Sequence, residues 1–360
     1  MTLKQINILV DSVKLFLIIL FSIAMISVII LFASDDPLNA IYYFFIGPFT
    51  SLRRIGNIIE GAIPLIFTAL AVIIIFRCGL FSMISEGSFF IGLLGATIIG
   101  TTFDFGAIAT PFVAIVFAAV LGSIASSIPA LLKFKWDVSE VVSSIMLNYI
   151  IQFFVIYMIS YHYREPLASS LASLKINENS QLALLIKGTK VHFGLIIALL
   201  FCTLVWVILY RSRLGFKIRV IGSNSNFAKY VGIKTGVSMV IAQIIAGAIA
   251  GAGGGVEMLG MYTRFKWTTS PGYGWTGIAV ALLAHSNPIM VPIAALFIAY
   301  LDVGAAIMAR SSDVSNEIVM VIQGVMMLLI AANALFSRWR QSLVVKNATS
   351  ENKSLLEAKA

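Results

Sequence analysis

A few polar side chains are set among long apolar segments, and these are the residues able to do chemistry. Glu86 stands just before the apolar run Phe89–Thr97, and Asn148 lies in the middle of another run. The Glu86 carboxylate could accept a hydrogen bond from a solute hydroxyl or amine, or cap the free amides of its own helical turn. Asn148 could bond a polar solute or a neighbouring helix. Trp275, beside a glycine-rich break, could stack on a planar ligand or lie at an interface.

The sequence lacks the usual signatures of an enzyme. It contains no phosphate-binding loop of the form G-x-x-x-x-G-K-[ST] and no G-x-S-x-G nucleophile motif. Its three histidines, His162, His192 and His285, have no Cys, His or carboxylate at ligand spacing. The two cysteines, Cys78 and Cys202, lie in or beside apolar runs and are interpreted as packing residues. We therefore expect neither a catalytic site nor a metal site.

The composition indicates a membrane protein. Of 360 residues, 59% are hydrophobic and only 11% are charged, too few charges to cover a water-soluble surface of this size. The apolar runs are continuous rather than alternating, which favours membrane-spanning helices over a barrel. The net charge of +9 is concentrated in loops and in the tail, so it indicates topology and not nucleic-acid binding.

The pattern predicts an all-α protein with about ten membrane-spanning helices. We expect one transmembrane domain over residues 1–345, with a polar tail over 346–360. The run 15–32 is too long for a typical signal peptide and is expected to be retained as the first helix. Basic residues beside the last helix place both termini in the cytosol. The predicted crossings are 14–33, 58–77, 80–101, 108–132, 141–160, 193–210, 236–256, 273–286, 288–306 and 316–336.

Two of these crossings are interrupted by Gly, Pro or polar residues. The first interruption covers Arg77–Ser88 and the second covers Ser270–Gly277, continuing to Pro288. They occupy corresponding places in the two halves of the chain and run in opposite directions, as in an inverted repeat with paired broken helices. Two loops mistaken for membrane segments would look the same. Arg77 is expected to reach the cytosolic surface by extending its side chain.

Small residues mark one face of the crossing 236–256. Gly247, Gly251 and Gly255 recur every four residues there. Small side chains let helix backbones approach closely in lipid, so this helix is expected to pack against another helix, in this chain or in a second subunit.

A basic loop over residues 211–235 joins two apolar runs and holds six Lys or Arg residues without any Asp or Glu. Such a loop is cytosolic. Asn224 is a suitable N-cap and Gly232 a suitable left-handed C-cap, so a short helix is expected between them. Phe227 and Tyr230 would form an apolar knob on it. The loop could lie on anionic lipid, or the helix could dock a cytosolic partner.

Four segments together resemble the permease subunits of ABC importers, in the branch that takes up branched-chain amino acids, ribose and nucleosides. In the order in which they are given below, the first segment is similar to one typical of the nucleoside-type members. The second and fourth resemble the two broken segments of the family, and the third resembles its cytoplasmic coupling loop. The sequence departs from the pattern at Ser82, Ser85, Ser88, Ser225 and Phe227. The segments are Glu140–Ile150; Pro64-Leu65 with Arg77–Phe81 and Glu86-Gly87; Gly222–Asn224 with Ala228, Tyr230, Gly232 and Ile233; and Gly272–Leu283 with Asn287-Pro288.

The resemblance implies a transport subunit of a bacterial inner membrane that has no ATPase site of its own. ATP and Mg would be used by a separate cytosolic ATP-binding subunit. A second permease chain, the same or related, would complete the pore, and an extracytoplasmic binding protein would deliver the solute. The residues expected to couple to the ATPase are Asn224, Phe227, Ala228, Tyr230 and Gly232.

The resemblance favours a nucleoside as the solute, with a sugar or a branched-chain amino acid as alternatives. The expected solute path includes Glu86, Asn148 and Trp275. A stand-alone secondary transporter or channel remains the alternative function, although its ion-coupling acids should cluster inside the membrane and those here are sparse. A structural membrane protein without a solute path is disfavoured by the paired broken segments.

Overall fold

The structure is a computed structural model, and it describes residues 27–31, 34–315, 318, 320, 321 and 323–325. Most of the expected crossings 14–33 and 316–336 and all of the tail 346–360 lie outside the described residues. Within them the chain is helical. It forms no strand there, only isolated bridges between Arg164 and Ser173 and between Leu184 and His192. The predicted all-α class is confirmed for this part of the chain.

The chain divides into two compact units, residues 1–47 with 304–360 and residues 48–303. Each unit is described by itself. The helices of the described residues, in chain order, are α2 (Pro37–Phe45), η1 (Gly47–Phe49), α3 (Leu52–Arg77), α4 (Ser85–Thr102), α5 (Ala109–Trp136), α6 (Glu140–His162), η2 (Glu178–Ser180), α7 (Gly194–Arg211), α8 (Arg213–Ser223), α9 (Ser225–Tyr230), α10 (Thr235–Met261), α11 (Tyr273–Leu283), η3 (Pro288–Met290) and α12 (Val291–Ser311).

Six helices in the described residues are long and apolar enough to cross a membrane. The chain is therefore a multi-pass membrane protein. These helices fall at six of the expected crossings, and α4 occupies a seventh, so a count of ten is not established. The six are α3, α5, α6, α7, α10 and the stretch Pro288–Ser311 that contains α12.

The expected crossing at 273–286 is not a full span. Helix α11 has 11 residues, a length of about 16 Å, whereas the hydrocarbon core of a bilayer is about 30 Å thick. His285 and Ser286 adopt positive φ angles of 51° and 53°, which stop the helix before η3 begins. The second interrupted segment is thus a short helix with a break on each side.

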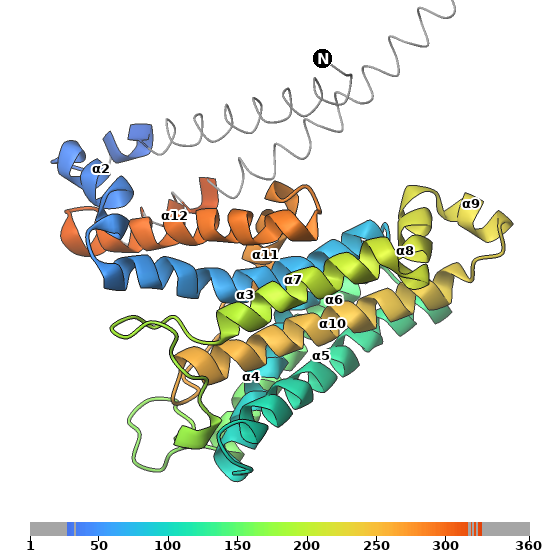
Figure 1. The fold of residues 1–360 in the computed structure, drawn as a ribbon, viewed down its shortest axis with the longest axis horizontal. Coiled ribbons are helices and arrows are strands. Elements are labelled where there is room, and N and C mark those ends of the chain that lie inside the picture. Colours follow the sequence, from blue (N-terminus) through green and yellow to red (C-terminus); the bar gives the residue numbers. More distant parts are fainter. Residues whose placement is uncertain (1–26, 32–33, 316–317, 319, 322, 326–360) are drawn as a thin grey trace, which may run out of the picture. The chain divides into compact units, whose positions relative to one another are not determined.

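Helix α3 is the centre of the larger unit. Every residue from Ala62 to Ile75 is buried, so the helix is surrounded by other helices on all sides. Figure 1 shows α7 and α10 running beside it, with α8 and α9 at the end of the unit where α3 stops. The C-terminal end of α3, where the first interrupted segment begins, therefore lies beside α8.

The glycine face of α10 packs within this chain. An added Cβ at Gly251 would lie 2.4 Å from the carbonyl oxygen of Ala118, and one at Gly122 would lie 2.3 Å from that of Gly247. Helices α10 and α5 therefore touch backbone to backbone, which confirms the expected close helix packing.

In the smaller unit, the carboxylate of Asp313 joins two segments that are far apart in the sequence. Asp313 accepts hydrogen bonds from Ser34 Oγ and from the backbone N–H of Asp35, each at 2.6 Å. The next residue, Asp36, caps α2 by accepting from the N–H of Asn39. These bonds join the segment before α2 to the segment after α12.

Candidate functional site

The first interrupted segment is a real break between two helices. Helix α3 ends at Arg77, Gly79 adopts a φ of +75°, and α4 begins only at Ser85. The N–H of Met83 donates to Ser144 Oγ on α6 at 3.0 Å. The break thus leaves backbone groups without helical partners, and a neighbouring helix satisfies one of them.

Asn148 fixes the start of α4. Its Nδ2 donates to the carbonyl of Met83 at 2.9 Å, and its Oδ1 accepts from the N–H of Gly87 at 3.0 Å. The amide therefore bridges the last turn of the break and the first turn of the helix. Of the two roles left open for Asn148, a bond to a neighbouring segment is the one present in the structure.

Glu86 caps the other interrupted segment. Its carboxylate is 3% exposed. Oε1 accepts from the N–H of Gly272 at 2.7 Å and from Ser270 Oγ, and Oε2 accepts from the N–H of Gly274 at 2.5 Å. These donors belong to the N-terminus of α11, where a negative charge is favoured. The expectation that Glu86 caps its own turn is therefore wrong in its partner, since the carboxylate serves α11.

A row of polar side chains on one face of α6 hydrogen-bonds to both interrupted segments. Ser144, Asn148 and Gln152 are four residues apart, so they share a face. Gln152 Oε1 accepts from the N–H of Ser270 at 3.3 Å, close to Glu86. Gln152 and Ser270 were missed by reasoning from the sequence, although the recurrence of polar residues every four positions in an apolar helix was a usable signal.

Tyr273 opens α11 and packs against α4. Its ring meets that of Phe89 edge to face, at 5.3 Å between centroids. Glu257 of α10 is also buried, and its Oε2 has no hydrogen-bond partner among the described residues. The first turn of α11 is thus attached to α4 through Glu86 and through the Tyr273 ring.

Trp275 lies one residue beyond the last amide that Glu86 binds. Its residue is 45% exposed, whereas Glu86 is buried. Asn148 thus bonds backbone groups at the break before α4, Glu86 joins α4 to the start of α11, and Trp275 lies in the first turn of α11.

The Arg77 side chain is held by two hydrogen bonds. Its Nε donates to the carbonyl of Ser286 at 3.0 Å, and its Nη2 donates to the Tyr210 hydroxyl at 3.2 Å. These bonds fix the guanidinium beside the segment that follows α11, and its reach to the cytosolic surface stays a prediction. A cation near the C-terminus of a helix is electrostatically favourable.

The short helix in the basic loop is present as α9 (Ser225–Tyr230). Asn224 Oδ1 accepts from the N–H of Phe227 at 3.0 Å. Gly232 has a φ of +82°, its N–H donates to Lys229, and the N–H of Ile233 donates to Ala228. These two backbone hydrogen bonds, together with a left-handed glycine, form a Schellman motif, so both expected caps are confirmed.

Helix α9 exposes two aromatic side chains beside the polar Ser225, Asn226 and Lys229. Tyr230 is 92% exposed and Phe227 is 57% exposed, while Ala228 is fully buried beneath them. A large exposed aromatic pair on a capped helix is a typical contact surface for another protein.

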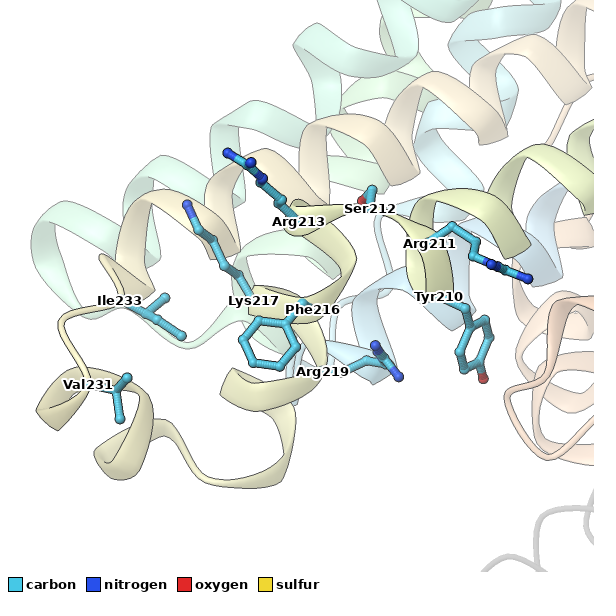
Figure 2. Close-up of a pocket in the computed structure, with 9 residues that line it drawn as sticks. All are labelled: Tyr210, Arg211, Ser212, Arg213, Phe216, Lys217, Arg219, Val231 and Ile233. Carbon is cyan, nitrogen blue, oxygen red and sulfur yellow. The ribbon is translucent and has the colours of Figure 1, made fainter.

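A second helix, α8 (Arg213–Ser223), precedes α9 and was not expected from the sequence. Ser212 caps it by accepting from the N–H of Gly215 at 3.0 Å. A pocket of about 470 Å³ lies between the two helices and the end of α7, and Figure 2 shows Arg219 directed toward Tyr210 in it. The lining residues are Tyr210, Arg211, Ser212, Arg213, Phe216, Lys217, Arg219, Val231 and Ile233.

Comparison with known families decides the identity of this architecture. The family model described as "branched-chain amino acid transport system / permease component" matches residues 54–331. The chain belongs to this family. The matched part includes both interrupted segments and the α8–α9 loop, and the resemblance found from the sequence is confirmed.

Several characterised permeases are similar to this one along most of their length. It is 31% identical to the guanosine ABC transporter permease protein of Bacillus subtilis, over 80% of this chain and 83% of that protein. It is 30% identical to a nucleoside ABC transporter permease protein of Lactococcus lactis, over 87% and 88%. It is 29% identical to a glucose ABC transporter permease protein of Haloferax volcanii, over 85% and 83%. No solved structure matches.

Proposed function

We propose that this permease carries a nucleoside across the bacterial inner membrane, as the transmembrane subunit of an importer driven by a separate ATP-binding subunit. Its membership of the permease family supports the importer role. The nucleoside is supported by the two relatives named for guanosine and for nucleosides. Both termini would lie in the cytosol.

The observation that carries the coupling part of the proposal is the capped helix α9 with its exposed Phe227 and Tyr230. A rigid helix bearing two exposed aromatic rings suits the cleft of a partner protein. We assign coupling to the ATP-binding subunit to Asn224, Phe227, Ala228, Tyr230 and Gly232, with the Phe227 and Tyr230 rings as the contact surface and the buried Ala228 beneath them. ATP and Mg would be bound by the ATP-binding subunit and not by this chain.

The way in which the interrupted segments are held supports alternating access as the transport mechanism. Glu86 and the polar row of α6 attach the starts of α4 and α11 to each other. A pull on either segment therefore moves both, and rocking of this unit would open the path to one side of the membrane at a time. Trp275 offers its exposed ring to a planar base, and Glu86 and Asn148 set the position of the helix that carries it.

The remaining partners follow from the same proposal. A second permease chain, the same or related, would complete the pore, and an extracytoplasmic binding protein would deliver the solute. Membrane lipid surrounds the spanning helices.

The test replaces both Phe227 and Tyr230 with Asp, and measures nucleoside uptake together with co-purification of an ATPase. We expect the ATPase to be lost and uptake to stop, while the protein still inserts in the membrane. Replacing Phe216, which is exposed on α8, with Asp is the matched control and should leave co-purification intact. Uptake that continued without any ATPase would favour a stand-alone secondary transporter.

A sugar is the second candidate solute, because the permease named for glucose is as similar to this chain as the nucleoside permeases are. Competition of labelled guanosine uptake by unlabelled nucleosides, glucose and branched-chain amino acids separates the candidates. Inhibition by nucleosides alone is the expected result. Inhibition by glucose or by an amino acid, without inhibition by nucleosides, would reverse the choice.

A further inference from the structure

Helix α8 touches the first interrupted segment through bare backbone. An added Cβ at Gly222, near the end of α8, would lie 2.2 Å from the carbonyl oxygen of Arg77 and 3.1 Å from the N of Gly79. From the other side, a Cβ at Gly79 would lie 3.1 Å from the Cα of Gly222. No side chain lies between the end of α8 and the first interrupted segment at this point, so a shift of one segment must displace the other.

Two residues, Ser223 and Asn224, separate this contact from α9. Asn224 closes α8, where its N–H donates to the carbonyl of Val220 at 3.0 Å, and it also caps α9 through Phe227. Because Asn224 makes one hydrogen bond to each helix, the short linker leaves little freedom of movement between α8 and α9. A force on the exposed face of α9 is therefore applied to Gly222 as well.

Arg77 also links this contact to the segment after α11 and to α7. Its backbone meets Gly222, while its side chain donates to the carbonyl of Ser286, just after α11, and to Tyr210. The Arg219 guanidinium of α8 lies 5.1 Å from the centre of the Tyr210 ring, so α8 also reaches Arg77 through this ring. Figure 2 shows Arg219 and Tyr210 close together.

The chain beyond Gly79 reaches the other end of α11. It runs through Met83, which α6 holds, to Glu86, whose carboxylate binds the amides of Gly272 and Gly274. Helix α11 is therefore attached at its start through Glu86 and past its end through Arg77. The Arg77 attachment begins at the Gly222 contact itself, and the Glu86 attachment lies seven residues beyond Gly79.

We propose that Arg77, together with the Gly79–Gly222 backbone contact, is the junction through which movement of α9 reaches both ends of α11. Arg77 is a positioning residue here, acting through Ser286 and Gly222 rather than on the solute. The proposal rests on the proposed function, because it needs a partner that moves α9.

The first test variant is Gly222→Ala, which forces the contact apart, and the second is Arg77→Lys, which leaves the backbone unchanged and cannot keep both side-chain bonds. Gly61→Ala is the matched control, because a Cβ there meets only the Cβ of Ala299 at an ordinary 3.7 Å. Each variant is purified with its ATP-binding subunit and reconstituted with its binding protein in vesicles, and guanosine uptake and ATP hydrolysis are measured.

We expect uptake by Gly222→Ala and Arg77→Lys to fall about tenfold, the size of effect seen for residues that couple two sites. The ATP-binding subunit should still co-purify and hydrolyse ATP, since α9 itself is unchanged. Gly61→Ala should behave as the unmodified permease. Normal uptake by both variants would overturn the proposal, as would loss of the ATP-binding subunit from both. Absence of ATP-dependent uptake by the unmodified complex would instead contradict the proposed function.

The reaction rate of the Cys78 thiol measures movement at the junction directly. It lies between Arg77 and Gly79, and burial, with a smaller contribution from nearby Glu140, raises the pKa of its thiol to about 12, so the thiol should react slowly with N-ethylmaleimide at rest. The reaction is followed in a Cys202→Ser background. ATP with vanadate should change its rate at least about fivefold in the unmodified complex, and much less in Gly222→Ala. An equal change in both would overturn the proposal.

Discussion

The carboxylate of Glu86, the second residue of α4, binds the backbone amide of Gly274, which is 188 residues further along the chain and the second residue of α11. Each of the two interrupted segments thus depends on the other. The charge of one segment satisfies the free amides of the second, and the second surrounds a buried carboxylate that would otherwise be costly. The two breaks form one polar joint within the larger unit.

Replacing Glu86 with Gln should destabilise the permease. A glutamine offers only one acceptor oxygen, so its NH2 group would face an amide N–H, and a charge-assisted bond worth about 1.5–3 kcal/mol would be lost. We expect the melting temperature of the purified protein in detergent to fall by about 4–10 °C.

The control for this variant is Glu178→Gln, because Glu178 has an exposed side chain in η2. It should change the melting temperature by no more than about 1 °C, as most surface substitutions do. Equal melting temperatures for Glu86→Gln and the unmodified protein would show that the Glu86 bonds contribute nothing.

Asn148→Leu should uncouple α6 from the start of α4. The substitution leaves the carbonyl of Met83 and the N–H of Gly87 without the partners they have now, at a cost of about 1–3 kcal/mol for each buried group. Uptake should fall and thermal stability with it. Tyr149→Leu, at an exposed neighbouring position, should preserve both, and a similar loss in the two variants would argue against a specific role for the amide.

Acidification should weaken the fold through His192. This side chain is fully buried against α10, and burial lowers its pKa from 6.5 to about 4. The unfolded chain takes up a proton near pH 6.5 while the folded chain does not. The neutral imidazole therefore contributes stability that is complete above pH 6.5, declines as the pH falls toward 4, and is lost below it.

The expected loss is about 3 kcal/mol between pH 6.5 and 4. It is measured as the melting temperature against pH for the unmodified protein and for His192→Gln, whose amide oxygen can still accept from the N–H of Gly194 as Nδ1 does at 3.1 Å. The variant should show a shallower decline in this range. Parallel curves for the two proteins would exclude His192 as the source.

The left-handed cap of α9 should matter for partner binding. Gly232→Ala places a Cβ on a residue with φ of +82°, at a cost of about 1–2 kcal/mol. The Schellman cap would loosen and the amount of ATPase recovered in co-purification should decrease. Gly232→Asn tolerates this conformation better and should retain more of the ATPase. The reverse order of the two variants would contradict the cap as the cause.

Local features of the structure were predictable from the sequence, whereas long-range partners were not. The caps of α9 at Asn224 and Gly232 depend on residues within one helical turn, and both were found from residue type and spacing. The break before α4 was likewise visible as a run of Gly and Ser residues. The partner of Glu86 was not, because local rules favour capping of the nearest amides and carry no information on a segment 188 residues away.

Helix α8 and the length of α11 were missed for different reasons. Residues Arg213–Ser223 contain two glycines and several β-branched residues, which lower helix propensity. Contact of Gly215 with the end of α7 offsets this, and that contact is visible only in the fold. In α11 only Ala284 follows Leu283 before the polar residues His285 and Ser286, and the positive φ angles of these two residues show where the helix stops.

Reconstitution decides whether a separate ATP-binding subunit drives this chain through α9. The purified permease is placed alone in vesicles, and guanosine accumulation is measured with and without a proton or sodium gradient, then again after adding the ATP-binding subunit, the binding protein and ATP. We predict no accumulation by the chain alone and accumulation by the complete set. Accumulation by the chain alone, under either gradient, would contradict the account.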